Sequence, residues 1–130
     1  MSHHRETVTA DPGPPAAGPY SHAVKSNGLV FLSGQTAVDP DTGQLIEGSI
    51  GDQTRRCLDN LQIVAQAAGA ELTDAVRVGI YVTDVSTFAE VNEAYATYFV
   101  SDPPARTTIG VAALPLGAEI ELDAVLAVPD

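Results

Sequence analysis

Residues 119–128 read EIELDAVLAV, and this stretch decides the fold that the rest of the chain must complete. Its alternation predicts a β-strand, because successive side chains of a strand point to opposite faces. One face would carry Ile120, Leu122, Ala124 and Leu126. The opposite face would carry Glu119, Glu121, Asp123, Val125 and Ala127. Since both faces include apolar side chains, this strand needs cover on each side.

Four other segments are expected to form strands, namely residues 29–32, 44–46, 75–83 and about 107–112. The run at 29–32 is apolar throughout, which predicts burial on both faces, and Ser33-Gly34 is expected to end it. The segment 44–46 would return after the turn formers of residues 39–43. The last two segments alternate, as half-buried strands do.

Two helices are expected between these strands. The first would begin at Ser49, which can cap it, and end at Gly69. The second would be capped by Asp84 or Ser86 and end before the prolines at 103–104. Their apolar stripes at helical spacing are Leu58, Leu61, Val64 and Ala68 in the first, and Phe88, Val91, Tyr95 and Tyr98 in the second.

The order of these elements is β-β-α-β-α-β-β, which indicates an α+β fold with a mixed sheet and two helices on one face. Two helices leave the other face of the sheet uncovered. That face would include apolar side chains from residues 29–32 together with Val125 and Ala127. We therefore expect a homo-oligomer in which this face is buried against another subunit.

Composition narrows the class of protein. The chain has 130 residues, 45% of them hydrophobic, which suits one domain with its own core. We expect a flexible N-terminal tail at residues 1–13 and a single domain at residues 14–130. Six Lys and Arg against 17 Asp and Glu give a formal charge of −11, which argues against binding to nucleic acids or anionic membranes. The sequence has no signal-peptide core and no apolar stretch of the roughly 20 residues that span a bilayer, so a cytoplasmic location is expected.

Familiar catalytic and metal-binding motifs are absent from the sequence. It contains no Walker loop, dinucleotide fingerprint, HExxH or G-x-S-x-G. Cys57, the single cysteine, lies in the first predicted helix, where a core position is a simpler interpretation than a nucleophile. His3 and His4 lie in the tail, and His22 is the one histidine outside it. The sequence therefore predicts neither a metal site nor a disulfide.

Polar side chains and glycines at the ends of predicted elements are candidates for a binding site: Tyr20, Ser33, Gly34, Asn92, Arg106 and Glu121. Taken singly, each also has a structural interpretation, such as a loop anchor for Arg106 or a surface charge for Glu121. Glu121 would lie on the uncovered sheet face, where a carboxylate is either exposed at a rim or paired. By elimination, Arg106 is the available partner for it.

Together, several segments are similar to the RidA family, also called YjgF. These segments are GPYSHAV (18–24), LVFLSGQ (29–35), QTRRCLDNL (53–61), VNEAYATYF (91–99), PARTTIGVAALP (104–115) and EIELDAVLAV (119–128). The resemblance runs from about Pro14 to Val128. It implies a chorismate-mutase-like α+β fold and a homotrimer with sites in the clefts between subunits. It also implies a 2-iminobutanoate/2-iminopropanoate deaminase, which hydrolyses enamine and imine intermediates released by pyridoxal-phosphate enzymes to 2-keto acids and ammonia, without a cofactor.

The resemblance further assigns roles to individual residues. Arg106 stands where the family has its carboxylate-binding arginine, and Glu121 stands where it has the glutamate implicated in placing water. The positions that match the substrate pocket are Tyr20, Ser33, Gly34 and Asn92, with Thr108 where members have Cys or Thr. Two features depart from the family: His22 stands where Gln is common, and the loop at 99–106 is shorter than in some members. Both bear on substrate preference.

Other classes of function stay open at this point. A trimer that binds small carboxylates through Arg106 without turnover would be a regulatory protein. A ribonuclease or translation-inhibitor activity is attributed to some relatives, but the charge of −11 and the lack of a basic patch argue against it. A chaperone-like role is a further alternative.

Overall fold

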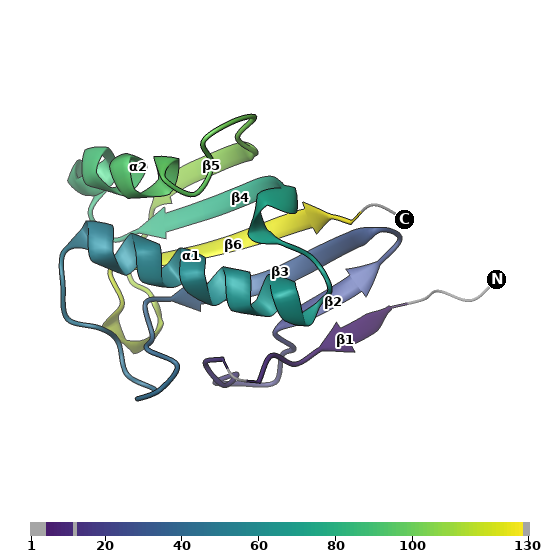
Figure 1. Ribbon diagram of the computed structural model, residues 1–130. Coiled ribbons are helices and arrows are strands. Elements are labelled where there is room, and N and C mark those ends of the chain that lie inside the picture. Colours follow the sequence, from purple (N-terminus) through teal and green to yellow (C-terminus); the bar gives the residue numbers. More distant parts are fainter. Residues whose placement is uncertain (1–4, 12, 129–130) are drawn as a thin grey trace.

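A single six-stranded sheet forms the centre of the computed structural model, which describes residues 5–11 and 13–128 (Figure 1). The strands are β1 (Glu6–Val8), β2 (Ala23–Ser26), β3 (Leu29–Thr36), β4 (Ala75–Val82), β5 (Ala105–Gly110) and β6 (Ile120–Ala127). Their order is β1-β2-β3-β6-β4-β5, and all neighbours are antiparallel except β4 and β5, which are parallel. The C-terminal strand β6 therefore lies inside the sheet, between β3 and β4.

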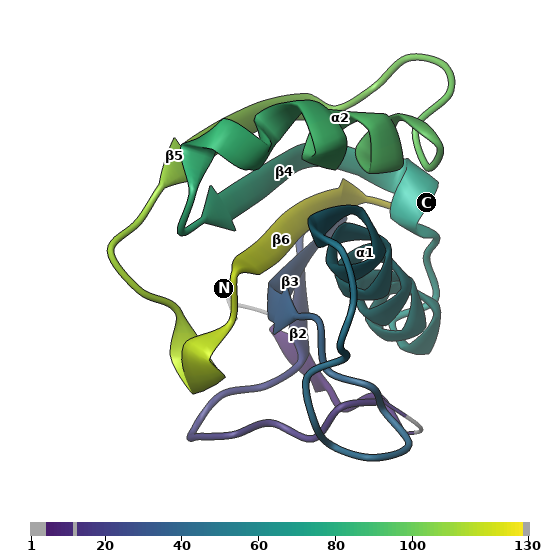
Figure 2. The same ribbon diagram turned by 90° about the vertical axis from the view of Figure 1, so that its left-hand side faces the viewer.

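Two helices, α1 (Ile50–Ala67) and α2 (Phe88–Ala96), lie on the same face of this curved sheet (Figures 1 and 2). The hydroxyl of Ser49 accepts a hydrogen bond from the Asp52 amide at 3.1 Å, so α1 begins where the sequence predicts. Asp84 caps a short turn that precedes α2 and accepts a bond from the Ser86 amide at 2.9 Å. The three short 3-10 turns are η1 (Leu72–Asp74), η2 (Val85–Thr87) and η3 (Pro115–Gly117). The predicted α+β architecture, with a mixed sheet and two helices, is thus confirmed.

The hydrophobic core lies between the helices and the sheet face that they cover. Fully buried side chains of the strands on this face are Val30, Val78, Ile80, Ile120, Leu122 and Leu126. They meet Leu58, Leu61 and Val64 of α1 and Val91 of α2. Burying each such side chain contributes about 1.5–3 kcal/mol. No helix among the described residues is long and apolar enough to cross a membrane.

The opposite face of the sheet is not covered by this chain. Phe31 of β3 and Ile109 of β5 are 45% and 44% exposed, and Val125 is only half-buried. The prediction that the run at 29–32 is buried on both faces is therefore wrong for the single chain, because Val30 is buried and Phe31 is not. Exposed apolar side chains on one sheet face call for a partner surface.

Strand β3 differs from its prediction in length and in register. It does not end at Ser33-Gly34 but continues to Thr36, with a register shift against β6 between Leu32 and Gln35. Leu32 pairs with Ala124 and Gln35 pairs with Leu122, so both face the helices. The irregularity between them leaves Gly34 on the uncovered face, which matters for the site described below.

Residues 44–46 form no strand, which corrects the prediction of a returning strand there. Leu45 makes only an isolated bridge with Val38. Two bonds hold the intervening turn closed, one from the Asp39 amide to the Gln44 carbonyl and one from the Gly43 amide to the Asp39 carbonyl, both at 2.8 Å. These bonds close the turn, and no ladder of paired strand residues continues from it at residues 44–46.

Strand β1 lies inside the segment for which the sequence predicts a flexible tail, and this prediction is corrected for residues 6–8. They pair antiparallel with β2, and Val8 lies opposite Ala23 with both side chains buried. One buried apolar residue in three is too short an alternation to predict a strand. Residues 1–4, with His3 and His4, lie outside the described residues.

Asn60 of α1 joins the helix to the chain that leaves β3. Its side chain is fully buried, and its amide nitrogen donates to the carbonyl oxygens of Val38 (2.8 Å) and Thr36 (3.2 Å). Its amide oxygen accepts two bonds from the Arg56 guanidinium. A single buried side chain therefore donates to two carbonyls of the segment that leaves β3.

We expect Asn60→Leu to lower the free energy of unfolding by about 1–3 kcal/mol, because the shape is kept while buried carbonyls lose their donor. Urea unfolding at fixed protein concentration measures this change. Gln66→Leu, an exposed amide-to-leucine change on the same helix, is the matched control and should have little effect. Equal midpoints for the two variants would show that the Asn60 bonds contribute nothing net.

Candidate functional site

The two predicted catalytic residues lie on opposite faces of the sheet. Arg106 of β5 pairs with Val78 of β4, whose side chain faces the helices. Glu121 of β6 pairs with Tyr81 of β4, which faces the other way. Strand β4 lies between them, so their backbones are also about 10 Å apart across the sheet. Within one chain, the two side chains do not meet.

Arg106 lines a small cleft on the helix side, which we call the arginine cleft. It has a volume of about 340 Å³ and is lined by Asn92, Tyr95, Ala96, Phe99, Pro103, Pro104 and Arg106. The guanidinium carbon Cζ of Arg106 lies 4.9 Å from the centre of the Tyr95 ring. Two of the predicted site residues, Asn92 and Arg106, thus line the same cleft.

Arg106 has no acidic partner in the described part of the chain. The two ion pairs found there are Arg55 with Asp52 and Arg77 with Asp123, at 3.3 and 3.5 Å. The sequence-based pairing of Arg106 with a carboxylate of the uncovered face is therefore wrong within one chain, since Arg77 takes Asp123 and Glu121 is out of reach. In a chain with a charge of −11, a cation that is left unpaired is available to bind an anion.

Thr108 lies two residues after Arg106 on the same face of β5 and pairs with Ile80. Its hydroxyl is buried and has no hydrogen-bond partner among the described residues, as is also the case for the Tyr95 hydroxyl. A buried hydroxyl without a partner costs about 1–3 kcal/mol, so such groups are uncommon. The Thr108 hydroxyl is on the same strand as Arg106, and the Tyr95 hydroxyl is on helix α2 beside it.

Glu121 lines a second pocket on the other side of the sheet, which we call the glutamate pocket. It has a volume of about 300 Å³. Its polar lining includes Tyr20, His22, Gln35, Thr36 and Glu121, and its apolar walls come from residues 14–17, Val38, Pro115 and Leu116. The structure thus brings Tyr20, Gly34 and Glu121 together at one pocket, apart from Arg106, Asn92 and Thr108.

Gly34 leaves the space that the Glu121 carboxylate occupies. A Cβ atom at position 34 would lie 2.7 Å from Oε2 and 2.9 Å from Cδ of Glu121. Any side chain there would push the carboxylate away. The role of Gly34 in the glutamate pocket is therefore to admit Glu121, in addition to whatever its backbone binds.

Ser33 and Tyr20 are held by bonds within the chain. The Ser33 hydroxyl donates to the Ser21 carbonyl at 2.6 Å, and the Ser33 amide donates to the His22 carbonyl at 3.0 Å. These bonds fasten the segment before β2 to β3, next to Tyr20. The Tyr20 ring is 49% exposed, and its hydroxyl accepts a bond from the Ala17 amide at 3.2 Å. Ser33 thus positions the wall of the glutamate pocket.

His22 has a fixed tautomer. Its Nδ1 accepts a hydrogen bond from the Ala10 amide at 2.8 Å, so in the neutral ring the proton is on Nε2. The side chain is 5% exposed, and Nε2 has no partner among the described residues. His22 lines the glutamate pocket and also joins the chain after β1 to the start of β2.

The environment of Glu121 favours its protonated form more than water does. Burial raises the pKa of the Glu121 carboxyl above its ordinary value, and the charge of Asp123 raises it further. Asp123 lies two residues along β6 on the same face and accepts a bond from the Tyr81 hydroxyl at 3.0 Å. A raised pKa makes a carboxylate a stronger base and so favours the transfer of a proton to it.

We expect Asp123→Asn to lower the pKa of Glu121, because the substitution removes a negative charge and leaves Arg77 unpaired nearby. Both changes favour the ionised carboxylate and therefore lower the pKa of Glu121. Carbon NMR titration of the Glu121 carboxyl measures the shift, and it needs no knowledge of a substrate. Asp59→Asn, on the outer face of α1, is the control that should leave the titration unchanged. A Glu121 pKa that stays the same in Asp123→Asn contradicts the electrostatic coupling.

Cys57 is a core residue, as the sequence predicts. It is fully buried, its sulfur lies 3.9 Å from the Ile120 carbonyl oxygen, and burial raises the pKa of its thiol well above the usual range. A thiol that stays protonated is a poor nucleophile. Across residues 5–11 and 13–128, no three His, Cys, Asp or Glu side chains gather as a metal site would require.

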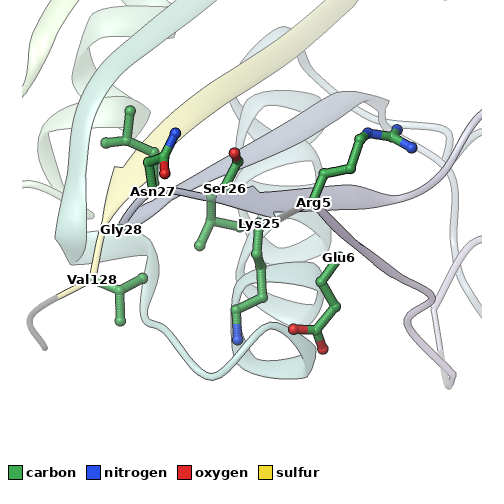
Figure 3. Close-up of a pocket in the computed structure, with 9 residues that line it drawn as sticks. Arg5, Glu6, Lys25, Ser26, Asn27, Gly28 and Val128 are labelled. Atoms are coloured by element: carbon green, nitrogen blue, oxygen red, sulfur yellow. The ribbon is translucent and has the colours of Figure 1, made fainter. Parts of the chain in front are cut away.

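A further hollow lies at the turn between β2 and β3, shown in Figure 3, with a volume of about 220 Å³. Lys25 and Glu6, which are cross-strand neighbours, extend to the same side there, and Arg5 points away from them. Leu29 at this end of β3 pairs with Ala127, whereas Thr36 at the other end pairs with Glu121. This hollow is therefore at the opposite end of the sheet from Glu121 and contains none of the predicted site residues.

Sequence reasoning missed Tyr95 and Asp123 as parts of the candidate site. Tyr95 fitted the apolar stripe of the second helix, and it is indeed only 5% exposed. The Arg106 guanidinium, however, also lies over its ring. Asp123 shares a strand face with Glu121, which the alternation of residues 119–128 already shows. That shared face was the one signal from which its effect on Glu121 could have been inferred.

Comparison with known proteins connects these features to a family. The family model described as Endoribonuclease L-PSP matches residues 11–128. The protein HMF1 of Saccharomyces cerevisiae is 45% identical over 123 residues, which cover 95% of each chain. Reactive Intermediate Deaminase A of Arabidopsis thaliana, a chloroplastic protein by its name, is 44% identical over 121 residues, or 93% of this chain and 65% of the plant protein.

A solved structure agrees in fold over nearly the whole chain. The crystal structure of RidA from an Antarctic Psychrobacter species matches with a TM-score of 0.90 and 37% identity, covering 95% of this chain and 99% of that one. The match extends through β6 and both helices, so it includes the strands that carry Arg106 and Glu121. The chain therefore belongs to the RidA (YjgF) family, whose family model carries the description Endoribonuclease L-PSP.

Proposed function

We propose that the protein is a deaminase that hydrolyses 2-imino acids, such as 2-iminobutanoate and 2-iminopropanoate with its enamine 2-aminoacrylate, to 2-keto acids and ammonia. The observation that carries this proposal is the unpaired Arg106 in a cleft of about 340 Å³, a size that suits a small anion. The name of the Arabidopsis relative, Reactive Intermediate Deaminase A, supports the reaction class.

We further propose that the active form is a homotrimer whose sites lie between subunits. Arg106 and Glu121 face opposite sides of the sheet, whereas the carboxylate and the imine carbon of a 2-imino acid are directly bonded. One small substrate can reach both residues only if they come from different copies. The exposed Phe31 and Ile109 on the uncovered face supply apolar surface for that contact. The number three follows from the family resemblance.

The proposed reaction begins with substrate binding at Arg106. Its guanidinium donates two parallel hydrogen bonds to the substrate carboxylate, which fixes the adjacent imine carbon. Asn92, from the same cleft, and the Thr108 hydroxyl, which lacks a partner in the chain, supply further hydrogen bonds. Tyr20 and Gly34 of the neighbouring copy close the site from the other side. Positioning of this kind is a large part of the catalysis that a reactive imine needs.

Glu121 would move the protons. The ionised carboxylate takes a proton from a water molecule as the water oxygen bonds to the imine carbon, and the C=N double bond becomes a C–N single bond. Glu121 returns this proton to the nitrogen, which gives the neutral carbinolamine. It then moves the proton of the carbinolamine hydroxyl to the nitrogen in the same way, so that the C–N bond breaks, ammonia leaves and the C=O bond of the keto acid forms. Water and imine are consumed, keto acid and ammonia are produced, and Glu121 ends as it began.

A coupled assay tests the proposed activity. Threonine dehydratase generates the imine in situ, and semicarbazide intercepts whatever escapes hydrolysis, so an active protein lowers the yield of semicarbazone. We expect a dose-dependent decrease. If the protein has no effect on the semicarbazone and still binds 2-oxobutanoate through Arg106, it is the non-catalytic carboxylate-binding protein instead.

Light scattering tests the proposed assembly. We expect the mass of a trimer at micromolar concentration, because the uncovered sheet face is apolar. A stable folded monomer at that concentration would contradict both the trimer and the shared site. A ribonuclease is not proposed, because the formal charge is −11 and Arg55 and Arg77 are already paired with acids.

A further inference from the structure

The Arg106 side chain is exposed and has few contacts that could hold it still. No carboxylate of the described residues lies within 4.0 Å of its guanidinium, and no hydrogen bond to a side chain or carbonyl holds it. An unrestrained arginine loses rotamer freedom when it is fixed on a ligand, and this loss weakens binding. A site built on Arg106 therefore benefits from something that orients the guanidinium before the ligand arrives.

The ring of Tyr95 is the fixed surface beside it. Cζ of Arg106 lies 4.9 Å from the ring centre, within the range in which a cation is attracted to an aromatic face. Tyr95 is 5% exposed, and Phe99, one turn later on the chain, packs against it with ring centres 4.8 Å apart and an angle of 38°. The ring is thus held from behind by the core.

A contact through Cζ and the ring face does not consume the N–H donors of a guanidinium, which point outward in its plane. The donors stay free for two parallel bonds to a carboxylate. The Tyr95 hydroxyl takes no part in this contact, since it is buried and has no partner among the described residues. The part of Tyr95 that faces Arg106 is therefore the ring alone.

We propose that Tyr95 is a positioning residue, whose buried ring orients the Arg106 guanidinium for a substrate carboxylate. This inference rests on the proposed function, because it assumes that Arg106 binds the substrate. It adds a residue that acts on the substrate through Arg106. It also explains why an aromatic side chain stands at a helix position that an aliphatic residue would fill equally well as core.

The experiment compares three variants with the wild-type protein. Tyr95→Phe keeps the ring and removes the unpartnered hydroxyl. Tyr95→Leu removes the ring that faces Arg106. Val91→Ala shortens a fully buried side chain of α2 that does not line the arginine cleft, and so serves as a matched core control. Each variant is measured for kcat and KM in the coupled imine assay, for the Kd of 2-oxobutanoate by calorimetry, and for its thermal melt.

We expect Tyr95→Phe to have the kinetics of the wild type. We expect Tyr95→Leu to raise KM and the Kd of 2-oxobutanoate about three- to thirtyfold with a smaller change in kcat, because an unoriented guanidinium weakens carboxylate binding. Val91→Ala should lower the melting temperature to a similar extent while leaving KM within about twofold of the wild type. If Tyr95→Leu does not fold, Tyr95→Met replaces it, since methionine fills irregular gaps without a ring.

Three results would overturn the proposal. The first is an unchanged KM and Kd in Tyr95→Leu. The second is an equal loss in Tyr95→Phe, which would assign the effect to the hydroxyl. The third is an equal loss in Val91→Ala, which would assign it to core packing. Failure of the proposed function is distinguished by the wild type itself, which would then not hydrolyse the imine, while its affinity for 2-oxobutanoate still reports on Arg106 and Tyr95.

Discussion

Arg106→Lys is expected to lower kcat/KM for imine hydrolysis about ten- to a hundredfold. Lysine keeps the positive charge, but it offers a point charge in place of two fixed parallel donors. The loss of one charge-assisted hydrogen bond costs roughly 1.5–3 kcal/mol, which corresponds to that factor. Arg106→Ala should reduce kcat/KM further, because no other cation of the described chain lines the arginine cleft.

The control for this prediction is Arg55→Lys, which changes an exposed arginine on α1 paired with Asp52. It should leave kcat/KM unchanged. Size-exclusion profiles and melting temperatures of both Arg106 variants should stay close to those of the wild type, since Arg106 is exposed. A fully active Arg106→Ala protein would falsify the proposed mechanism, and a collapse of its assembly would show that Arg106 has a structural role instead.

Glu121→Gln is expected to lower kcat about a hundred- to ten-thousandfold with little change in the Kd of 2-oxobutanoate. Glutamine can still hydrogen-bond a water molecule but cannot take its proton, and general-base catalysis contributes factors of this size. Glu119→Gln is the matched control, because its carboxylate accepts a bond from Gln53 and lies outside the glutamate pocket. A normal kcat in Glu121→Gln would mean that this residue only shapes the pocket.

Because Arg106 and Glu121 lie on opposite faces of the sheet, a mixture of two inactive variants can test whether they act across an interface between subunits. Arg106→Ala and Glu121→Gln chains carry complementary halves of the proposed site. When they are unfolded and refolded together, random assembly gives about a quarter of the sites both intact halves. We expect a corresponding return of activity in the mixture alone. Confirmed mixed oligomers without any activity would show that Arg106 and Glu121 do not act across an interface.

Sequence patterns predicted the strands and helices in which the periodic pattern is long. They failed for segments of only a few residues. The alternation over residues 75–83 and 119–128 gave strands within a residue or so of β4 and β6, and the capping residue Ser49 gave the start of α1. β1 has three residues with one buried apolar side chain, so it left no periodic signal. Turn-forming residues precede residues 44–46, which favoured a returning strand there. A strand also needs a partner with free backbone groups, and that depends on tertiary structure.

The same limit applies to the candidate site, where the sheet face of each side chain has to be predicted. The alternation of residues 119–128 correctly put Glu121 on the face away from the helices. For Arg106, the predicted strand began at about residue 107, two residues after β5 begins, and the face of its side chain depends on the parallel pairing of β5 with β4. That pairing joins residues about 28 positions apart through α2, and no local pattern encodes it. The resemblance of short segments identified which residues to examine, whereas only the sheet order separates them into two halves.

The separation of Arg106 and Glu121 onto two faces has a consequence for inheritance. If the protein forms the proposed trimer and a cell makes equal amounts of normal chains and of chains lacking Arg106, about half of the sites keep both residues. A chain that lacks both Arg106 and Glu121 leaves only about a quarter of the sites intact, because it disables the clefts on both of its sides. The doubly altered allele is thus the more dominant one, although either alteration alone already abolishes turnover in a pure trimer.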